Sequence, residues 1–136
     1  MQISLYTDGG ARGNPGHAGV GCVLFNSSGD VIKSEGEYIG ETTNNVAEYR
    51  GLIKGLKLAL GVEAVEVNCY LDSELVVKQL NGEYRVKDAN LRKLFDEVLL
   101  LKSRFKDISF NHVPRSENKI ADKLVNEAID KKLDTA

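Results

Sequence analysis

Apolar and polar positions follow two different periods along the chain, and the period changes near residue 46. Before that point, short stretches rich in β-branched, aromatic and aliphatic residues are separated by clusters of turn residues, a pattern typical of strands and hairpins. These stretches predict strands over residues 3–8, 19–25 and 31–39. Because short turns join successive strands, we expect the three to form an antiparallel meander.

After residue 46, helical and strand-like patterns alternate. Apolar residues spaced three and four positions apart predict an amphipathic helix over residues 46–60, and Gly61 provides a natural end. Strict alternation of apolar and polar residues then indicates a half-buried strand over residues 65–72. The remaining pattern predicts helices over residues 73–80, 91–105 and 121–133, a strand over residues 108–113 and a loop over residues 114–119.

This order of elements predicts an α/β fold with a five-stranded mixed sheet flanked by helices. Three antiparallel strands are followed by two strands parallel to the first, with right-handed crossovers. The 136 residues suit one domain with a real core, and the sequence contains no internal repeat, low-complexity tract or linker. We therefore treat residues 1–136 as a single domain.

Composition narrows the class of protein but not its function. Hydrophobic residues make up 42% and charged residues 28% of the chain, as in ordinary soluble proteins, and no apolar run reaches membrane-spanning length. Because strand-like sequence starts at residue 3, we expect no signal peptide. Cys22 and Cys69 lie in apolar stretches, which favours free thiols in a reducing compartment. We expect a cytoplasmic protein without a membrane partner, and the net charge of −2 neither indicates nor excludes a nucleic-acid-binding face.

Four acidic residues fall at or near the ends of predicted elements. They are Asp8 and Asp72 at strand ends, Glu48 in the first turn of the first helix and Asp122 at the start of the last helix. Because the carboxyl ends of parallel strands share one edge of an open sheet, this topology brings the four together. Clustered carboxylates repel one another unless cations bind between them, and oxygen ligands favour Mg²⁺ or Mn²⁺ over zinc.

Each acid also has a structural interpretation that requires no ligand. Asp8 belongs to a turn-forming Asp-Gly pair, and Glu48 lies three residues after Asn45, the spacing of a capping box. Asp72 suits the N-cap of the short helix that follows, and Asp122 suits the positive end of the last helix. Structural roles for all four would need four independent coincidences, whereas one metal site accounts for them together.

Other catalytic chemistries lack their characteristic residues. His17 and His112 have no partners at zinc-binding spacing, and no Ser-His-Asp arrangement is evident. The glycine-rich segment at residues 9–16 matches neither the phosphate-binding loop nor the dinucleotide-binding fingerprint. The four acids are therefore the strongest candidates for catalysis.

Four segments, in this order along the chain, resemble type 1 ribonuclease H. They read YTDGGARGNPG at residues 6–16, TTNNVAE at residues 42–48, LDSE at residues 71–74 and NKIAD at residues 118–122. Each segment alone is a weak signal, but together they span nearly the whole chain and are highly specific. The resemblance implies a ribonuclease H-like fold and an endoribonuclease that hydrolyses the RNA strand of RNA–DNA hybrids, leaving 5′-phosphate and 3′-hydroxyl ends. We also expect a monomer with no obligate protein partner.

By the same resemblance, the four acids would be catalytic metal ligands. Asp8 would bridge two Mg²⁺ ions, for which Mn²⁺ is a substitute. Glu48 and Asp72 would complete one metal site, and Asp122 would complete the other. Two such ions activate the attacking water and stabilise the leaving 3′-oxygen, so no protein nucleophile is needed. Glu48 would also lie near a ribose 2′-hydroxyl, a group by which a protein distinguishes RNA from DNA.

The resemblance also places several residues against the hybrid. They are the backbone amides of Gly9 and Gly10 and the side chains of Asn14, Thr43, Asn44 and Asn45. Two of these keep structural alternatives, because Asn14 begins an Asn-Pro turn and Asn45 suits a helix N-cap.

Two features of the family are missing. The loop before the last acid, at residues 112–118, is short and has no histidine where many members carry a mobile one. Arg115 is the candidate for part of that role, and its alternatives are a phosphate-binding or a solvated arginine. The chain also lacks tryptophan, and residues 81–90 are too few to form the basic protrusion of several bacterial members. Nearby cations that would contact the DNA strand or form a solvated helix face are Arg85, Lys87, Arg92 and Lys93.

Two other functions compete with this interpretation. Holliday-junction resolvases, transposases and integrases have related acidic sites, but they usually differ in acid spacing and carry larger binding regions. A non-catalytic binding module is the other alternative, and the loss of any one acid would favour it. All four acids are present, so the sequence favours a metal-dependent nuclease.

Overall fold

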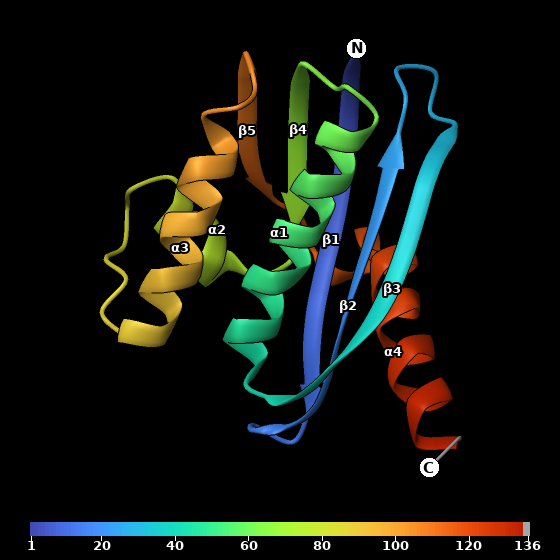
Figure 1. Cartoon of the computed structure of the whole chain (residues 1–136), viewed down its shortest axis with the longest axis vertical. Helices are drawn as coiled ribbons and strands as arrows, with labels where there is room; N and C mark the ends of the chain where they lie inside the picture. The colour runs from blue at the N-terminus through green and yellow to red at the C-terminus, as the bar shows by residue number, and fades with distance from the viewer. Residues whose placement is uncertain (135–136) are drawn as a thin grey trace.

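A five-stranded mixed sheet in the order β3-β2-β1-β4-β5 forms the centre of the computed structural model, which describes residues 1–134 (Figure 1). In chain order, the elements of this described part are β1 (Gln2–Arg12), β2 (Gly16–Phe25), β3 (Val31–Thr42), α1 (Asn44–Gly61), β4 (Glu66–Leu71), α2 (Glu74–Leu80), α3 (Ala89–Lys102), β5 (Asp107–His112), the 3₁₀ helix η1 (Arg115–Glu117) and α4 (Lys119–Asp134).

Strand pairing confirms the predicted topology. β1 pairs antiparallel with β2, and β2 antiparallel with β3, whereas β4 is parallel to β1 and β5 is parallel to β4. The sheet therefore joins a three-stranded meander to two strands that helical crossovers add on the other side of β1. Because β1 is the central strand, its carboxyl end is where the two halves of the sheet meet.

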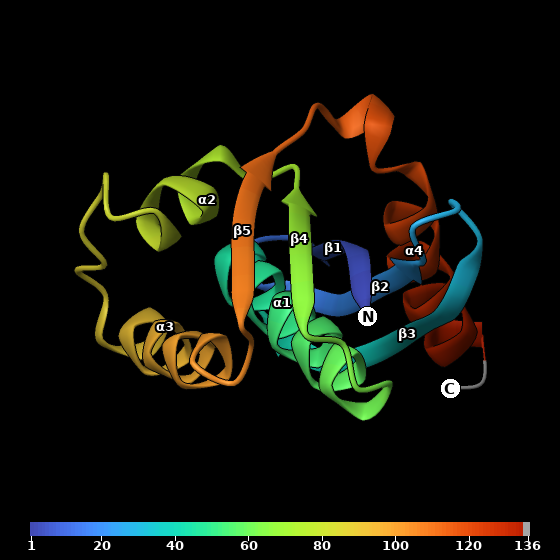
Figure 2. The ribbon, with the colours of Figure 1, turned by 90° about the horizontal axis from the view of Figure 1, so that it is seen from above.

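The helices cover the two faces of the sheet unequally (Figure 2). α1 packs across β1 and β2 on one face with α3 beside it, and α4 packs across β2 and β3 on the opposite face. The main core lies between α1 and the sheet, and its largest fully buried side chains include Leu5, Leu24, Tyr49, Leu56 and Leu71. Burial of each such side chain stabilises the fold by roughly 1.5–3 kcal/mol, so this face holds α1 firmly.

α4 comes closest to the sheet at positions where the strands carry glycine. Three glycines lie closest to the backbone of this helix, and we call them the glycine floor: Gly19, Gly21 and Gly36. A Cβ atom added to Gly21 would overlap the carbonyl oxygen of Ala121, and one added to Gly36 would overlap another helix carbonyl. The backbone of α4 therefore lies directly against the sheet, a close approach for which glycine is needed.

β1 is longer than the sequence predicted. The expectation that the first strand ends at Asp8 is wrong, because β1 continues to Arg12. The two glycines after Asp8 extend the antiparallel ladder with β2, so pairing overrides their low strand propensity. The parallel ladder with β4, by contrast, ends at Thr7. Asp8 is thus the first residue beyond the part of β1 that is paired on both sides.

Other boundaries differ by a few residues. β2 begins at Gly16 and β3 continues to Thr42, while α3 ends at Lys102 rather than near residue 105. Residues 115–117 form a 3₁₀ turn where the sequence predicted only a loop, and α4 follows from Lys119. Within residues 1–134, none of the helices combines the length and the apolar character needed to cross a bilayer.

Candidate active site

Three acidic side chains from three segments converge at the carboxyl end of the parallel strands. One carboxylate oxygen from each of Asp8, Glu48 and Asp72 lies within 4.8 Å of the other two. Asp8 belongs to β1, Glu48 to α1, and Asp72 directly follows β4. Because β1 and β4 are parallel neighbours in register, the residues that follow their shared ladder lie side by side. We call these three residues the carboxylate cluster.

Asp8 lies at the centre of this arrangement. It is only 7% exposed, and its Oδ1 accepts a hydrogen bond from the backbone N–H of Gly9 at 2.9 Å. The pKa of Asp8 is raised to about 7, mainly by burial. Hydrogen bonding with Glu48 opposes the shift, and the charges of Asp72 and Asp122 add to it. A cation beside Asp8 would reverse the shift, because positive charge favours the ionised carboxylate.

Glu48 reaches Asp8 because α1 is pressed against β1. A Cβ atom at Gly9 would overlap the carbonyl group of Ala47, so only glycine allows the helix this close. Glu48 is 8% exposed, and its buried Oε2 has no hydrogen-bond partner among residues 1–134. Burial, and then the charge of Asp8, raises the pKa of Glu48 well above its usual range. A buried, unpaired carboxylate oxygen is costly, and a bound cation would compensate this cost.

The helix caps differ from those expected from the sequence. The side chain of Thr43 caps α1 by accepting a hydrogen bond from the backbone N–H of Val46 at 3.3 Å, so the structural alternative for Asn45, an N-cap, does not hold. Ser73 caps α2 in the same way, so the structural alternative for Asp72, an N-cap, does not hold either. Hydroxyl, amide and carboxylate side chains all suit an N-cap. The sequence therefore did not show whether Thr43 or Asn45 caps α1, or whether Asp72 or Ser73 caps α2.

Asp122 faces the carboxylate cluster from the first turn of α4. It lies outside the group of three whose oxygens are within 4.8 Å, yet its charge contributes to the raised pKa of Asp8. Nη2 of Arg115 lies 3.5 Å from Oδ1 of Asp122, and 80% of the Arg115 side chain is exposed. An exposed ion pair contributes little stability, so other anions can compete with Asp122 for Arg115.

One cleft of about 380 Å³ contains all four predicted acids. Its lining includes Asp8, Gly9, Gly10, Arg12, Asn44, Glu48, Asp72, Arg115, Asp122 and Asn126. The acids offer only carboxylate oxygens, the ligands that Mg²⁺ and Mn²⁺ prefer. The unpaired oxygen of Glu48 and the raised pKa of Asp8 both indicate that positive charge would stabilise the site. The residues present therefore fit a hard divalent cation.

The residues predicted to contact a hybrid brace the turn after β1. Oδ1 of Asn44 accepts a hydrogen bond from the backbone N–H of Ala11 at 2.8 Å, and Oδ1 of Asn14 accepts one from the backbone N–H of Asn44 at 3.0 Å. These bonds tie the turn to the start of α1. Of the predicted contacts, the cleft is lined by Gly9, Gly10 and Asn44. Those outside its lining are Asn14, Thr43 and Asn45.

Sequence reasoning assigned no role to three polar residues beside the acids: Arg12, Asn118 and Asn126. Asn118 is 1% exposed, and its Nδ2 donates to the main-chain oxygen of Thr7 at 2.8 Å. This bond anchors the start of α4 to β1 immediately before Asp8. Arg12 and Asn126 line the cleft and are hydrogen-bonded to each other. No periodicity signals such contacts, because the partners lie more than 100 residues apart.

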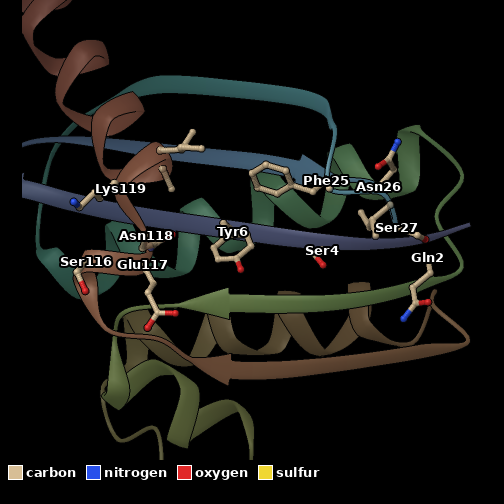
Figure 3. A pocket seen from close by; sticks show the side chains of 14 residues that line it. Gln2, Ser4, Tyr6, Phe25, Asn26, Ser27, Ser116, Glu117, Asn118 and Lys119 are labelled. Carbon is tan, nitrogen blue, oxygen red and sulfur yellow. The ribbon is translucent and has the colours of Figure 1, made fainter.

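A larger cavity of about 690 Å³ lies beside the start of α4 (Figure 3). Tyr6 and Phe25 meet edge to face on its sheet wall, with ring centroids 5.6 Å apart, and Glu117 and Lys119 border it near the helix. None of the four acids lines this cavity. The larger cavity is therefore not the candidate active site. The convergent carboxylates place that site in the smaller cleft.

Known proteins resemble this chain over most of its length. The family described as reverse transcriptase-like matches residues 6–128. A bifunctional protein of Mycobacterium tuberculosis is 44% identical over 131 residues, which are 96% of this chain and 36% of the relative. Ribonuclease HI of Halobacterium salinarum is 42% identical over 129 residues, which are 95% of this chain and 65% of the relative. The chain thus spans less than two thirds of the length of either relative.

Solved structures share the fold. RNase H1 from the halophilic archaeon Halobacterium salinarum superposes with a TM-score of 0.94 at 41% identity, covering 96% of this chain and 99% of the other. LC11-RNase H1, isolated from compost and solved in complex with an RNA/DNA hybrid, gives a TM-score of 0.91 at 48% identity, with the same coverage of the two chains.

Proposed function

This chain belongs to the type 1 ribonuclease H family, and on this basis we propose that it is a metal-dependent endoribonuclease acting on RNA–DNA hybrids. It would hydrolyse the RNA strand and leave 5′-phosphate and 3′-hydroxyl ends. The observation that carries the proposal is the carboxylate cluster, in which acids from three segments lie within 4.8 Å of one another. The choice of substrate is supported by LC11-RNase H1, a relative solved with an RNA/DNA hybrid.

We propose that the acids of the cleft hold two divalent ions, Mg²⁺ or its substitute Mn²⁺. Asp8, Glu48 and Asp72 would hold one ion, and Asp8 together with Asp122 would hold the other. When bound, such ions activate a water molecule for in-line attack and neutralise charge on the leaving 3′-oxygen. The unpaired Oε2 of Glu48 supports this assignment, because buried acceptors rarely lack a partner.

The chain's own groups prepare the site for this reaction. The backbone N–H of Gly9 orients the carboxylate of Asp8, and the contact of α1 with β1 fixes Glu48. Glu48 would also accept a hydrogen bond from a ribose 2′-hydroxyl, a group that DNA lacks. Among the described residues, the cleft lining includes no serine, threonine, cysteine, lysine or histidine. This lining supports direct attack by water rather than by a protein nucleophile.

The hybrid would lie across the turn after β1 and the start of α1. Its contacts there would be the backbone amides of Gly9 and Gly10 and the side chains of Asn14, Thr43, Asn44 and Asn45. DNA-strand phosphates would meet the cations in the loop after α2 and in the first two turns of α3, namely Arg85, Lys87, Arg92 and Lys93. Because these contacts are few, hybrid affinity should be modest and should fall with salt along a shallow slope. An affinity unaffected by salt would contradict this part of the proposal.

Arg115 is the proposed auxiliary residue. Its exposed guanidinium pairs with Asp122 at 3.5 Å, and arginine binds phosphate oxygens strongly. A phosphate of the product strand would compete with Asp122 for Arg115 and so assist product release.

Cleavage of a strand-labelled RNA–DNA hybrid tests the proposal. With Mg²⁺, the wild-type protein should cut only the RNA strand, and matched DNA–DNA and RNA–RNA duplexes should stay intact. EDTA should abolish cutting, and Asp8→Asn should reduce it on the order of 10³-fold or more, because a shared metal ligand is lost. Asp107→Asn is a matched control, since Asp107 is an exposed acid at the opposite end of the parallel strands.

Two results would contradict the proposal. If the wild-type protein binds the hybrid but never cuts it with Mg²⁺ or Mn²⁺, the chain is a non-catalytic binding module. If Asp107→Asn loses activity as fully as Asp8→Asn, the cleft is not the site of the reaction.

The cellular setting belongs to the same proposal. Cys22 and Cys69 are both free and buried, which supports a reducing compartment such as the cytoplasm. We expect the protein to act as a monomer, and light scattering in the presence and absence of hybrid measures this directly.

A further inference from the structure

Arg12, the last residue of β1, reaches across to α4. Its Nη1 lies 2.6 Å from Oδ1 of Asp130. Its Nη2 donates to the side-chain oxygen of Asn126 at 3.2 Å and to the main-chain oxygen of Asn126 at 3.4 Å. The guanidinium fork therefore engages two residues that lie one turn apart on the helix. The single ammonium of a lysine would not reproduce this geometry.

Asn126 links Arg12 to the residue that carries the fourth acid, Asp122. Its Nδ2 donates to the main-chain oxygen of Asp122 at 3.0 Å, one helical turn nearer to the carboxylate cluster. Hydrogen bonds thus run from Arg12 through Asn126 to Asp122.

The segment that carries Arg12 is anchored at its other side. The backbone N–H of the preceding residue, Ala11, donates to Oδ1 of Asn44 at 2.8 Å, and Asn44 begins the helix that carries Glu48. Arg12 therefore stands between the element that supplies Glu48 and the element that supplies Asp122.

The glycine floor explains why α4 needs a contact of this kind. At the three glycines of the floor, the sheet offers no side chains that could interlock with the helix, and the residues that α4 buries are Ala121, Val125 and Ile129. Such a contact holds the helix against the sheet but resists sliding along it only weakly, because interdigitation normally fixes the position of packed elements. A shift of about 1 Å would be large for a ligand of Mg²⁺, which demands near-ideal geometry.

We infer that Arg12 is a positioning residue that holds Asp122 opposite the carboxylate cluster. The inference rests on the proposed function, since Asp122 matters only if the cleft binds metal. It adds a residue that belongs neither to the four acids nor to the proposed hybrid contacts. In this role Arg12 acts through Asn126 and α4 rather than as a ligand of the ion or a contact of the hybrid.

Kinetics of Arg12→Ala, Arg12→Lys and Asn126→Ala test the inference. Cleavage should be followed at temperatures well below the melting transitions, across a series of Mg²⁺ concentrations. Arg12→Ala should need about 10-fold more Mg²⁺ for half-maximal rate and should lose about 10-fold in kcat, with KM for the hybrid changed by less than about twofold. Arg12→Lys should fall between Arg12→Ala and wild type. The double variant of Arg12 and Asn126 should resemble the single variants, because both residues act along one chain of contacts.

Lys123→Ala is the matched control. Lys123 is an exposed cation on the same helix, and its ion pair with Glu127 does not reach β1. This variant should keep the wild-type Mg²⁺ requirement and the wild-type kcat.

Two measurements do not depend on activity. In an Asp8→Asn background, adding Arg12→Ala should change hybrid affinity by less than about twofold, because Arg12 does not contact the hybrid. In the metal-free protein, Arg12→Ala should speed amide exchange in α4 by about 10-fold or more and leave α1 unchanged, because only the local opening of α4 becomes easier.

Three outcomes would overturn the inference. A raised KM or weakened hybrid binding with an unchanged Mg²⁺ requirement would make Arg12 a substrate contact. An equal effect of Lys123→Ala would indicate a general loss of α4 stability, and unaltered exchange in α4 would show that Arg12 does not hold the helix. If the wild-type protein cuts no hybrid, the proposed function fails, while the exchange measurement still decides whether Arg12 holds α4.

Discussion

The two faces of the sheet hold their acids by different means. On the α1 face, Glu48 extends from a helix whose large side chains fill the main core, and α1 touches the backbone of β1 at Gly9. On the α4 face, Asp122 extends from a helix that lies on the glycine floor and is tied by polar contacts at Arg12 and Asn118. Packing fixes the first acid, whereas hydrogen bonds between separate segments fix the second. We therefore expect the α1 half of the cleft to be rigid and the α4 half to be adjustable.

The largest effect should follow from separating α1 from β1. In Gly9→Ala, the new Cβ would overlap the carbonyl group of Ala47, so the helix must retreat and carry Glu48 away from Asp8. A displacement of about 1 Å should lower kcat about 10²-fold, and overpacking should cost roughly 1–3 kcal/mol of unfolding free energy. Hybrid cleavage and urea denaturation measure the two effects.

Gly10→Ala is the control for the stability of this variant. A Cβ at Gly10 meets only a Val125 methyl group at 3.9 Å, an ordinary contact, so the urea midpoint should stay near that of wild type. If Gly9→Ala is as stable and as active as wild type, the α1 face is not rigid at this contact.

The second effect is a dependence of stability on pH, which arises from the buried carboxyl groups of Asp8 and Glu48. In metal-free protein, the pKa of Asp8 is raised from 3.8 to about 7 and that of Glu48 is also raised, so the folded state binds more protons than the unfolded state. Stability should therefore be highest below about pH 4 with respect to these groups and should fall as pH rises through 7. For Asp8 the loss is on the order of 4 kcal/mol, because the shift is about three pKa units and one pKa unit corresponds to about 1.4 kcal/mol. Thermal melts in EDTA across this range measure it.

Asp8→Asn should flatten this dependence, while the exposed-acid control Asp107→Asn should not. Adding Mg²⁺ at pH 8 should raise the melting temperature of wild type and have little effect on Asp8→Asn, because the ion stabilises the folded state that binds it. A metal-free protein whose stability is constant from pH 4 to pH 8 would contradict the raised pKa values.

The smallest effect should come from lifting α4. In Gly21→Ala, the added Cβ would meet the helix backbone at Ala121 and the side chain of Leu124. Because α4 can shift outward, we expect a loss of about 1–2 kcal/mol in unfolding free energy and a smaller loss of kcat than in Gly9→Ala. Gly61→Ala is the control, since a Cβ at Gly61 meets nothing within 4 Å. If Gly21→Ala is less active than Gly9→Ala, the α4 half of the cleft is the more rigid one, which would contradict the comparison.

Much of the fold was predictable from the sequence because local patterns carried it. Turn residues and short apolar runs predicted the meander, and alternating periods predicted the parallel addition of β4 and β5, which strand pairing confirms. The end of β1 was not predictable, because glycine has a low strand propensity and the pairing partner that overrides it lies elsewhere in the chain. The caps at Thr43 and Ser73 were missed because neighbouring residues suit an N-cap equally well.

The candidate site also has a part that the sequence predicted and a part that it did not. Asp8 and Asp72 were placed by the rule that ligands bind at the carboxyl ends of parallel strands, and the structure brings both into one cluster with Glu48. Arg12 and Asn118 contact partners more than 100 residues away along the chain. Local sequence patterns do not predict such contacts. Sequence reasoning therefore located the acids but not the residues that hold α4 in place.

The position of α4 at the end of the described chain has a consequence for biosynthesis. A polypeptide is made from its amino terminus, and α4 is the last described element to emerge. A nascent chain that has already formed β1, α1 and β4 carries the carboxylate cluster but not Asp122. We expect such a chain to be inactive toward an RNA–DNA hybrid until α4 has emerged and docked on the glycine floor.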